Sequence, residues 1–237
     1  MARSTPKSEF WLGFRKAAPL GIVVGPFGVL FGVLATEAGL NVLEVMAFSF
    51  VVLAGAAQIT ALQMMQDNAP TVIILATALA VNLRMAMYSA ALAPHLGAAP
   101  LRTRIAAAYF TVDQSFAMSS ERFEQRPQMP LAQKIAFFFG TVAPVCPLWY
   151  LGTWFGAVLG NVIPPWLPLD FAVPITFVAM MAPALRTRAH IAAAAVGVTV
   201  SLACVALPYN LGIMVGGLAG IISGAWVEKR TDAKATP

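Results

Sequence analysis

The sequence predicts an all-α protein: an integral membrane bundle of seven to eight transmembrane helices with both termini in the cytoplasm. Of the 237 residues, 59% are hydrophobic and only 11% are charged, whereas a soluble domain carries about 25% charged residues. The hydrophobic residues form long continuous runs and do not alternate as in a membrane β-barrel. Basic residues cluster between these runs, which is how the orientation of a membrane protein is set. We therefore expect a multi-pass protein of the inner (plasma) membrane.

The predicted organisation is one transmembrane domain, residues 17–227, between a cytoplasmic segment at 1–16 and a cytoplasmic tail at 228–237. The first residues, MARSTPKSEF, are polar and lack the apolar core of a cleavable signal peptide. The fourth and sixth candidate spans are short, so a broken or re-entrant segment is an alternative to one of them. The candidate spans are 17–36, 45–65, 71–93, 105–120, 135–160, 170–185, 190–207 and 210–227.

Placing the N-terminus in the cytoplasm agrees with the distribution of basic residues. Twelve basic residues then lie inside: Arg3, Lys7, Arg15, Lys16, Arg122, Arg126, Lys134, Arg186, Arg188, Lys229, Arg230 and Lys234. Arg102 and Arg104, in the loop 94–104, are the exceptions and lie outside. The hairpin of the second and third spans is consequently the part of this layout that agrees least with the charge distribution. The net charge of +5 serves orientation, so no nucleic acid is expected as a partner.

A short internal similarity suggests a two-half repeat. FGVLFG at 27–32 and FGAVLG at 155–160 share the pattern Phe-Gly-x-x-x-Gly and run in the same direction in this layout. Transporters are often built from two such halves. Chance is the alternative, because small residues at this spacing are common in membrane helices.

Glycines at four-residue spacing form two smooth strips. The first interpretation is packing against another helix of the chain, and the second is an interface with a partner or a sliding surface. The strips are Gly152, Gly156 and Gly160, and Gly212, Gly216, Gly220 and Gly224.

Helix-breaking residues predict discontinuous helices near a transport site. Gly25, Pro26 and Gly28 lie in the first span, and Pro144 lies in the fifth. Proline frees backbone carbonyls that a transporter can offer to a substrate or ion. A simple kink is the alternative.

The apolar spans contain two charged side chains, Arg84 and Asp113. Arg84 lies nine residues before position 93 and Asp113 eight residues after position 105, so both lie about 12 to 14 Å below the expected outer boundary. Their spans are consecutive, and pairing is the least costly way to keep both charges in a membrane. The pair is either a structural ion pair or a site where Arg84 binds a substrate carboxylate and Asp113 carries a proton or acts as counter-ion. A third interpretation, an unpaired Arg84 that reaches the membrane boundary, is less favoured because the boundary is more than two helical turns away.

Three neutral polar residues are further candidates for substrate binding or coupling: Gln58, Asn82 and Gln114. Asn82 and Arg84 lie on different sides of an ideal helix, so a shared site requires unwinding. Phe27, Phe31 and Met85 are candidates for contact with an aliphatic substrate side chain.

No enzyme motif is present. The chain lacks a Gly-x-x-x-x-Gly-Lys-Ser/Thr phosphate loop, and His95 and His190 are too few and too far apart for a metal site. Cys146 and Cys204 lie in apolar stretches and read as small core residues. We expect no cofactor and no metal.

Several segments, in order and spacing, resemble the large subunit of AzlC/YgaZ-type branched-chain amino-acid exporters. They are PLGIVVGPFGVLFGVLATEAGL, LAGAAQ, VNLRMAMYSAALAPHL, TVDQSFAM and LDFAVPITFVAMM. The resemblance implies an inner-membrane permease for hydrophobic amino acids and a small AzlD/YgaH-type membrane subunit as partner, with no ATPase. The family commonly has Asp-Glu in the fourth span, where this chain has Asp113 and Gln114.

The working hypothesis is a secondary exporter of branched-chain or other small hydrophobic amino acids, coupled to protons, in which Arg84 exchanges Asp113 for the substrate carboxylate. The alternative is a non-transporting membrane scaffold that assembles a transport complex.

Overall fold

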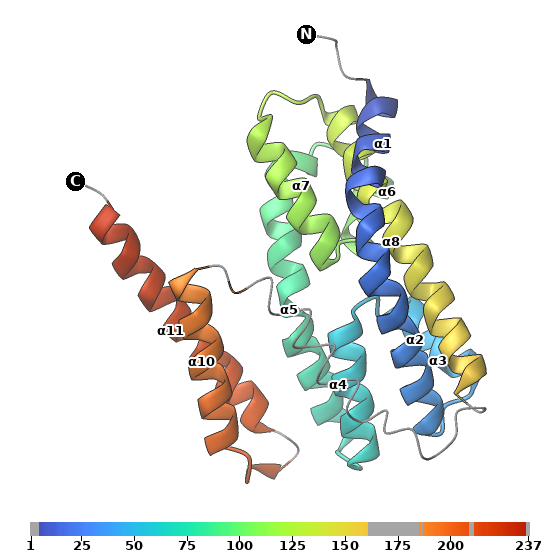
Figure 1. Cartoon of the computed structure of the whole chain (residues 1–237), viewed down its shortest axis with the longest axis vertical. Helices are drawn as coiled ribbons and strands as arrows, with labels where there is room; N and C mark the ends of the chain where they lie inside the picture. The colour runs from blue at the N-terminus through green and yellow to red at the C-terminus, as the bar shows by residue number, and fades with distance from the viewer. Residues whose placement is uncertain (1–4, 161–184, 186, 209–210, 236–237) are drawn as a thin grey trace. The chain divides into compact units, whose positions relative to one another are not determined.

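The computed structural model describes residues 5–160, 185, 187–208 and 211–235 (Figure 1). All regular structure in these residues is helical. They divide into two compact units: the first unit holds residues 5–62 and 81–160, and the second unit holds residues 63–80 and the described residues from 185 onward. Each unit is described by itself.

The chain begins with α1 (Pro6–Ala17), a short 3-10 helix η1 (Ala18–Leu20), α2 (Gly21–Glu37), α3 (Val42–Val51) and α4 (Gly55–Gln66). It continues with α5 (Thr71–Leu96), α6 (Leu101–Tyr109), α7 (Asp113–Gln125) and α8 (Leu131–Leu159), and then α10 (Arg188–Ala203) and α11 (Leu211–Ala235). By length and composition, four described stretches can cross a membrane: Pro6–Glu37, Thr71–Leu96, Leu131–Leu159 and Leu211–Thr231.

The centre of the first unit is a close parallel pair of helices, α2 with α8. A Cβ on Gly28 would lie 2.8 Å from the carbonyl oxygen of Trp149, and one on Gly152 would lie 2.6 Å from that of Gly25. Such backbone contact requires glycine on both helices. Gly13 of α1 contacts Phe137 of α8 in the same manner. The contacts therefore follow the same order along α1–α2 and along α8, so these helices run in the same direction.

Helices α3 and α4 form a hairpin that reverses at residues 52–54. A capping box of Asn41 and Glu44 starts α3. The Gln58 amide donates to the hydroxyl of Ser49 over 3.3 Å. Residues nine positions apart lie about 13.5 Å apart along a straight helix, so the chain must turn back between them.

Helices α6 and α7 form a second hairpin, which reverses at residues 110–112. Asp113, at the start of α7, contacts Arg84 near the middle of α5, while Arg122, near the end of α7, contacts Glu9 of α1. Lys134 of α8 lies 3.3 Å from His95, near the end of α5. The hairpin therefore enters from, and returns to, the end where α1 and α8 begin and α5 ends (Figure 1).

The two hairpins approach from opposite ends of α8 and their tips meet beside Tyr150. The hydroxyl of Tyr109, at the end of α6, donates to the carbonyl of Phe50 over 2.7 Å and lies 2.8 Å from the Tyr150 hydroxyl. The ring of Phe50 stacks on Tyr150 at 4.5 Å. Helices α3 and α6 have 10 and 9 residues, about 15 and 14 Å, which is half of a hydrocarbon core of about 30 Å.

In the second unit, α10 and α11 pack antiparallel through the second glycine strip. A Cβ on Gly220 would lie 2.8 Å from the carbonyl of Ala193, and one on Gly224 would lie 3.4 Å from that of Ala189. The hydroxyl of Thr77 donates to the sulfur of Met214 over 3.6 Å. Both predicted glycine strips thus lie in helix contacts within the chain, as the first interpretation expects.

Several expectations from the sequence need correction. The stretches 45–65 and 105–120 are not single helices but are broken at 52–54 and 110–112. The predicted breaks at Pro26 and Pro144 are wrong, since α2 and α8 continue through them. Prolines at these positions are tolerated because close neighbouring helices support the backbone. The predicted span 170–185 lies almost wholly outside the described residues.

The loop 94–104 is also on the side opposite to the one expected. It lies at the end of the first unit where α1 begins, because the hairpin α3–α4 does not cross and the direction of α5 is reversed. Arg102 and Arg104 therefore lie near the same end of the first unit as the basic residues of α1, in agreement with the clustering of basic residues on one side. The two Phe-Gly-x-x-x-Gly segments lie on the parallel helices α2 and α8, in direct contact.

Candidate functional site

The candidate site is the ion pair between Arg84 of α5 and Asp113 of α7. Arg84 Nη1 lies 3.2 Å from Asp113 Oδ2, and each side chain is 34% exposed. Arg84 Nε and Asp113 Oδ1 are buried and have no hydrogen-bond partner among the described residues. The pairing predicted from the two depths is confirmed, although the depths were counted from the wrong side. Each of the two side chains thus has one polar atom that makes no hydrogen bond among the described residues, next to the bond between Arg84 and Asp113.

The electrostatics of the site leave an excess of positive charge. Asp113 is the first residue of α7, and the free N–H groups of a helix start carry about half a positive charge. The guanidinium of Arg84 adds a full charge, and one carboxylate balances the two. An additional carboxylate is therefore tolerated here better than an additional cation.

Tyr88 and Phe116 form the next layer of the site. Tyr88 lies one turn after Arg84, and its phenol interacts with the Asp113 carboxylate. Its ring stacks on Phe116 with centroids 4.1 Å apart and planes within 8°. This layer supplies an apolar wall with one hydroxyl. The sequence interpretation missed Tyr88, although its spacing of four residues from Arg84 places it on the same helix face.

The other predicted site residues do not join the ion pair. Helix α5 is continuous through residues 82 to 84, so Asn82 points about 200° away from Arg84; its Oδ1 is buried without a partner among the described residues. Gln114 follows Asp113 on α7 and is half-buried. Met85 follows Arg84 on α5.

Gln58 belongs to a separate buried polar cluster at the tip of α3–α4. The Ser49 hydroxyl accepts from Gln58 and from the indole of Trp149 over 3.0 Å, and it lies 3.4 Å from the hydroxyl of Thr153. The predicted contacts Phe27 and Phe31 pack against Trp149, with centroids 5.6 and 6.1 Å away, and thus surround this cluster instead.

A second charged cluster, which the sequence interpretation also missed, lies at the far end of α7. Glu9 of α1 is 2% exposed and accepts from Arg122 over 2.8, 2.9 and 3.2 Å and from Arg126 over 3.0 Å. We call Glu9, Arg122 and Arg126 the carboxylate clamp. The spacing of the two arginines, four residues, was the available signal.

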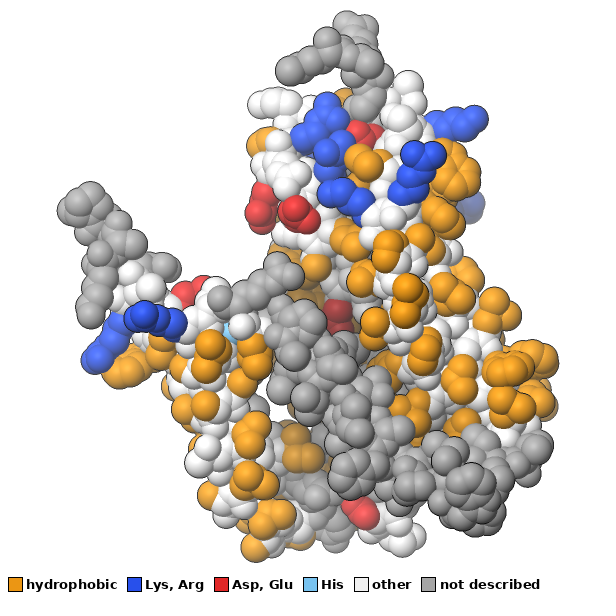
Figure 2. Space-filling view, in the orientation of Figure 1, with side chains coloured by type: hydrophobic (Ala, Val, Ile, Leu, Met, Phe, Trp, Pro, Cys, Tyr) orange, Lys and Arg blue, Asp and Glu red, His pale blue; other side chains and the backbone are white. Residues whose placement is uncertain are grey.

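The clamp lies among further basic and aromatic side chains, and basic residues gather at this end of the first unit (Figure 2). Arg122 lies over the ring of Phe137 at 5.8 Å, and Lys134 lies over that of Phe123 at 5.7 Å. Phe123 is fully buried and also contacts His95, with centroids 5.2 Å apart. Among the described residues, no group of three or more His, Cys, Asp or Glu side chains is arranged to hold a metal ion.

Comparison with known proteins agrees with the membrane architecture. Residues 19–163 match the family model described as AzlC protein. The chain is 28% identical over 222 residues to an uncharacterized membrane protein of Archaeoglobus fulgidus, covering 92% of this chain and 94% of that protein. It is 23% identical over 229 residues to the inner membrane protein YgaZ of Escherichia coli, covering 92% of each. No solved structure matches the chain. The family match covers more than half of the chain, which therefore belongs to the AzlC family of membrane proteins.

Proposed function

We propose that this protein is a secondary transporter that exports branched-chain or other small hydrophobic amino acids across the inner membrane, coupled to protons. Membership of the AzlC family and similarity to YgaZ support a transporter. The observation that carries the proposal is the pair of buried, unpartnered atoms, Arg84 Nε and Asp113 Oδ1, beside their mutual bond.

The chemistry of these two groups fits an amino-acid zwitterion. A guanidinium binds a carboxylate with two parallel N–H donors, which requires Nε or a second terminal nitrogen in addition to the one already used. The carboxylate of Asp113 is an acceptor for the substrate ammonium. The stacked rings of Tyr88 and Phe116 give an apolar surface for an aliphatic side chain.

Release of substrate then requires that Arg84 return to Asp113. When substrate binds, its carboxylate replaces Asp113 on the guanidinium, and Asp113 is free to take the substrate ammonium or a proton. When substrate leaves, the ion pair closes again. In the substrate-free state both charges are paired, so the free energy of this state is low and the exchange is reversible.

The tip of a half-depth hairpin is a suitable place for such an exchange. Discontinuous helices at the middle of a membrane are the common binding elements of secondary transporters, since their ends provide uncompensated dipoles. We further propose a small AzlD/YgaH-type membrane subunit as partner, which rests on family membership alone.

Efflux of valine and leucine from cells tests the proposal. The variants are Arg84→Lys, Asp113→Asn and the exchange of the two charges, with Arg102→Lys as a control, because Arg102 is exposed on α6. We expect the first three to lose at least 90% of efflux at normal membrane abundance and the control to retain it. Normal efflux in all three would refute the site. If abundance falls in the single variants and returns in the exchange without efflux, the pair is structural, and a scaffold function is favoured.

A further inference from the structure

Helix α7 is held at both ends by contacts between charges. At its start Asp113 contacts Arg84 of α5, and at its end Arg122 and Arg126 contact Glu9 of α1. The helix has 13 residues and is about 19 Å long, so it transmits a displacement of one end to the other as a rigid rod. The two ends are bound to different helices.

Between its ends α7 also makes an apolar contact, through the fully buried ring of Phe123 against Phe137 of α8. The helices around α7 are joined by backbone contact instead. The carbonyl of Trp149 would be 2.8 Å from a Cβ on Gly28, so α2 and α8 have essentially one way to fit. The hairpin α3–α4 is similarly close-packed, since a Cβ on Gly55 would lie 2.7 Å from Phe27 and 2.8 Å from Trp149. These contacts are neutral and dense. We call α2, α8 and the hairpin α3–α4 the frame. The charged contacts of α7 can be exchanged while the frame keeps its arrangement.

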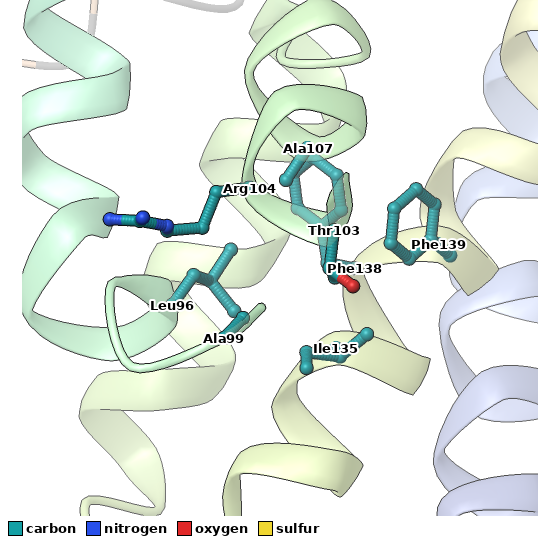
Figure 3. Close-up of a pocket in the computed structure, with 8 residues that line it drawn as sticks. All are labelled: Leu96, Ala99, Thr103, Arg104, Ala107, Ile135, Phe138 and Phe139. Carbon is teal, nitrogen blue, oxygen red and sulfur yellow. The ribbon is translucent and has the colours of Figure 1, made fainter. Parts of the chain in front are cut away.

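The first arm of the hairpin, α6, is bordered by unfilled space. A groove of about 170 Å³ runs along α5 and α6; its lining includes Leu92, Leu96, Arg104, Ala107, Ala108 and Thr111. A small void of about 10 Å³ adjoins the groove at Leu96 and Ala107, between α6 and Phe138 and Phe139 of α8 (Figure 3). The larger groove leaves one face of α6 without packing partners among the described residues, so less dispersion attraction holds α6 there.

We infer that the carboxylate clamp is a gate: Glu9 releases Arg122 and Arg126 when the hairpin α6–α7 swings away from α1, and this movement opens the ion-pair site toward the end where the clamp lies. The inference rests on the proposed function, because exchange of Asp113 for substrate at the start of α7 is what displaces the helix. The clamp suits this role because its bonds are ionic and their partners can be replaced by water when Glu9 is released.

The test measures the exposure of the hairpin tip without any substrate. The purified chain carries Thr111→Cys together with Cys146→Ala and Cys204→Ala, and the readout is the rate of reaction with a charged methanethiosulfonate reagent. Thr111 is 4% exposed in this structure, so reaction in the parent is expected to be slow. Glu9→Gln is expected to raise the rate at least tenfold, and Arg126→Gln, which leaves the Arg122 contacts in place, by a smaller factor.

Two controls separate a gate from general loosening. Glu121→Gln removes an equal charge from α7, where Glu121 accepts from Gln125 at an exposed position, and is expected to leave the rate unchanged. A chain with Val45→Cys as its single cysteine reports on the packing of α3, where Val45 is fully buried away from the hairpin α6–α7; Glu9→Gln is expected not to alter its reaction.

Equal rates in Glu9→Gln, Arg126→Gln and the parent would overturn the gate, as would a parallel increase at the cysteine in position 45. If Glu9→Gln does not fold, Arg126→Gln decides by the same criterion. The labelling experiment needs no transport and tests the gate alone. The efflux of the Arg84 and Asp113 variants tests the proposed function, so failure of one proposal is distinguishable from failure of the other.

Discussion

A guanidinium halfway along a membrane helix is tolerable in this protein because of its immediate neighbours. Asp113 compensates the charge of Arg84 at 3.2 Å, and Tyr88 offers a polar group one turn further along the same face. An unpaired arginine at this depth costs roughly 2.5 to 3.5 kcal/mol on insertion scales. The residues that lower this cost are the same ones that we assign to substrate recognition.

Tyr88→Phe tests the hydroxyl of the site without disturbing its packing. The stack on Phe116 is kept, and only the bond to the Asp113 carboxylate is lost. A hydrogen bond to a charged group contributes about 1.5 to 3 kcal/mol. Once the substrate carboxylate replaces Asp113 on Arg84, Asp113 depends more on the phenol than in the empty pair, so we expect the apparent affinity for leucine to fall by up to about tenfold at normal abundance. Concentration dependence of uptake into vesicles measures this. An unchanged affinity would show that the phenol does not act on the site.

Glu9→Gln tests the stability contribution of the carboxylate clamp. The substitution leaves Arg122, which is 15% exposed, without a counter-charge, while the more exposed Arg126 can turn to solvent. Removal of one partner from a buried ion pair costs about 3 to 5 kcal/mol, and we expect the lower end of this range. Unfolding by sodium dodecyl sulfate in mixed micelles, followed by circular dichroism, gives the value. For the exposed Glu121→Gln we expect a change within about 0.5 kcal/mol.

Single residues differ in how far the sequence could identify them. Arg84 and Asp113 were found because charges in an apolar run have few explanations, and their pairing followed because both depths were counted from one side. The side assigned to the loop 94–104 was wrong, but the pairing depends only on both depths being counted from the same side. Glu9 could not be found in this way, since near the N-terminus a carboxylate in a polar segment normally faces water. Its burial depends on helices more than a hundred residues away.

At the scale of elements, glycine determines which helices come closest. The α2 and α8 backbones meet over several turns, and the first glycine strip lies in this contact. The sequence predicted such a strip from its spacing alone, because the period of a helix does not depend on the partner. It did not identify α2 as the partner.

Paired alanine substitutions on α2 test this contact. A Cβ at Gly28 would collide with the backbone of Trp149, whereas at Gly25 it would meet nothing within 4 Å. We expect Gly28→Ala to lower the unfolding free energy by at least about 1 kcal/mol, the range for overpacking. Gly25→Ala is expected to be neutral or to stabilise by up to about 1 kcal/mol through helix propensity. Equal effects of the two, measured in mixed micelles, would contradict the predicted packing.

The breaks in the helices were misplaced for a physical reason. Proline and glycine mark a break when the backbone is exposed, but Pro26 and Pro144 lie in helices supported by close neighbours. The real breaks, at 52–54 and 110–112, contain Val, Leu, Ala, Phe and Thr, which carry no strong turn signal. They exist because the two tips meet at Tyr150, a tertiary contact that local sequence does not encode.

At the scale of the whole molecule, two hairpins of matching design enter from opposite ends of α8. Each follows a long helix after four residues, has a first arm of 10 or 9 residues, reverses over three residues, and returns. Each hairpin returns to the end from which it starts. Helix α5, which lies between the two hairpins, therefore runs opposite to the direction that a simple count of apolar runs predicts. The basic residues of the first unit then gather at one end.

Sidedness of labelling tests this topology. Single cysteines at Ala98 and Gln128 are expected to react with an impermeant maleimide from the same side of the membrane, and one at Asn41 from the other. The native Cys146 and Cys204 are replaced by alanine throughout. If the stretches 45–65 and 105–120 were complete spans, Ala98 and Gln128 would react from opposite sides.

The central claim is that the Arg84–Asp113 pair binds the amino acid, and equilibrium binding of radiolabelled leucine to the purified chain tests it most directly. We predict saturable binding by the parent chain and by Arg102→Lys, and at least a tenfold weaker affinity in both Arg84→Lys and Asp113→Asn. Equal affinity in the parent and these two variants, with all four proteins folded, would contradict the claim.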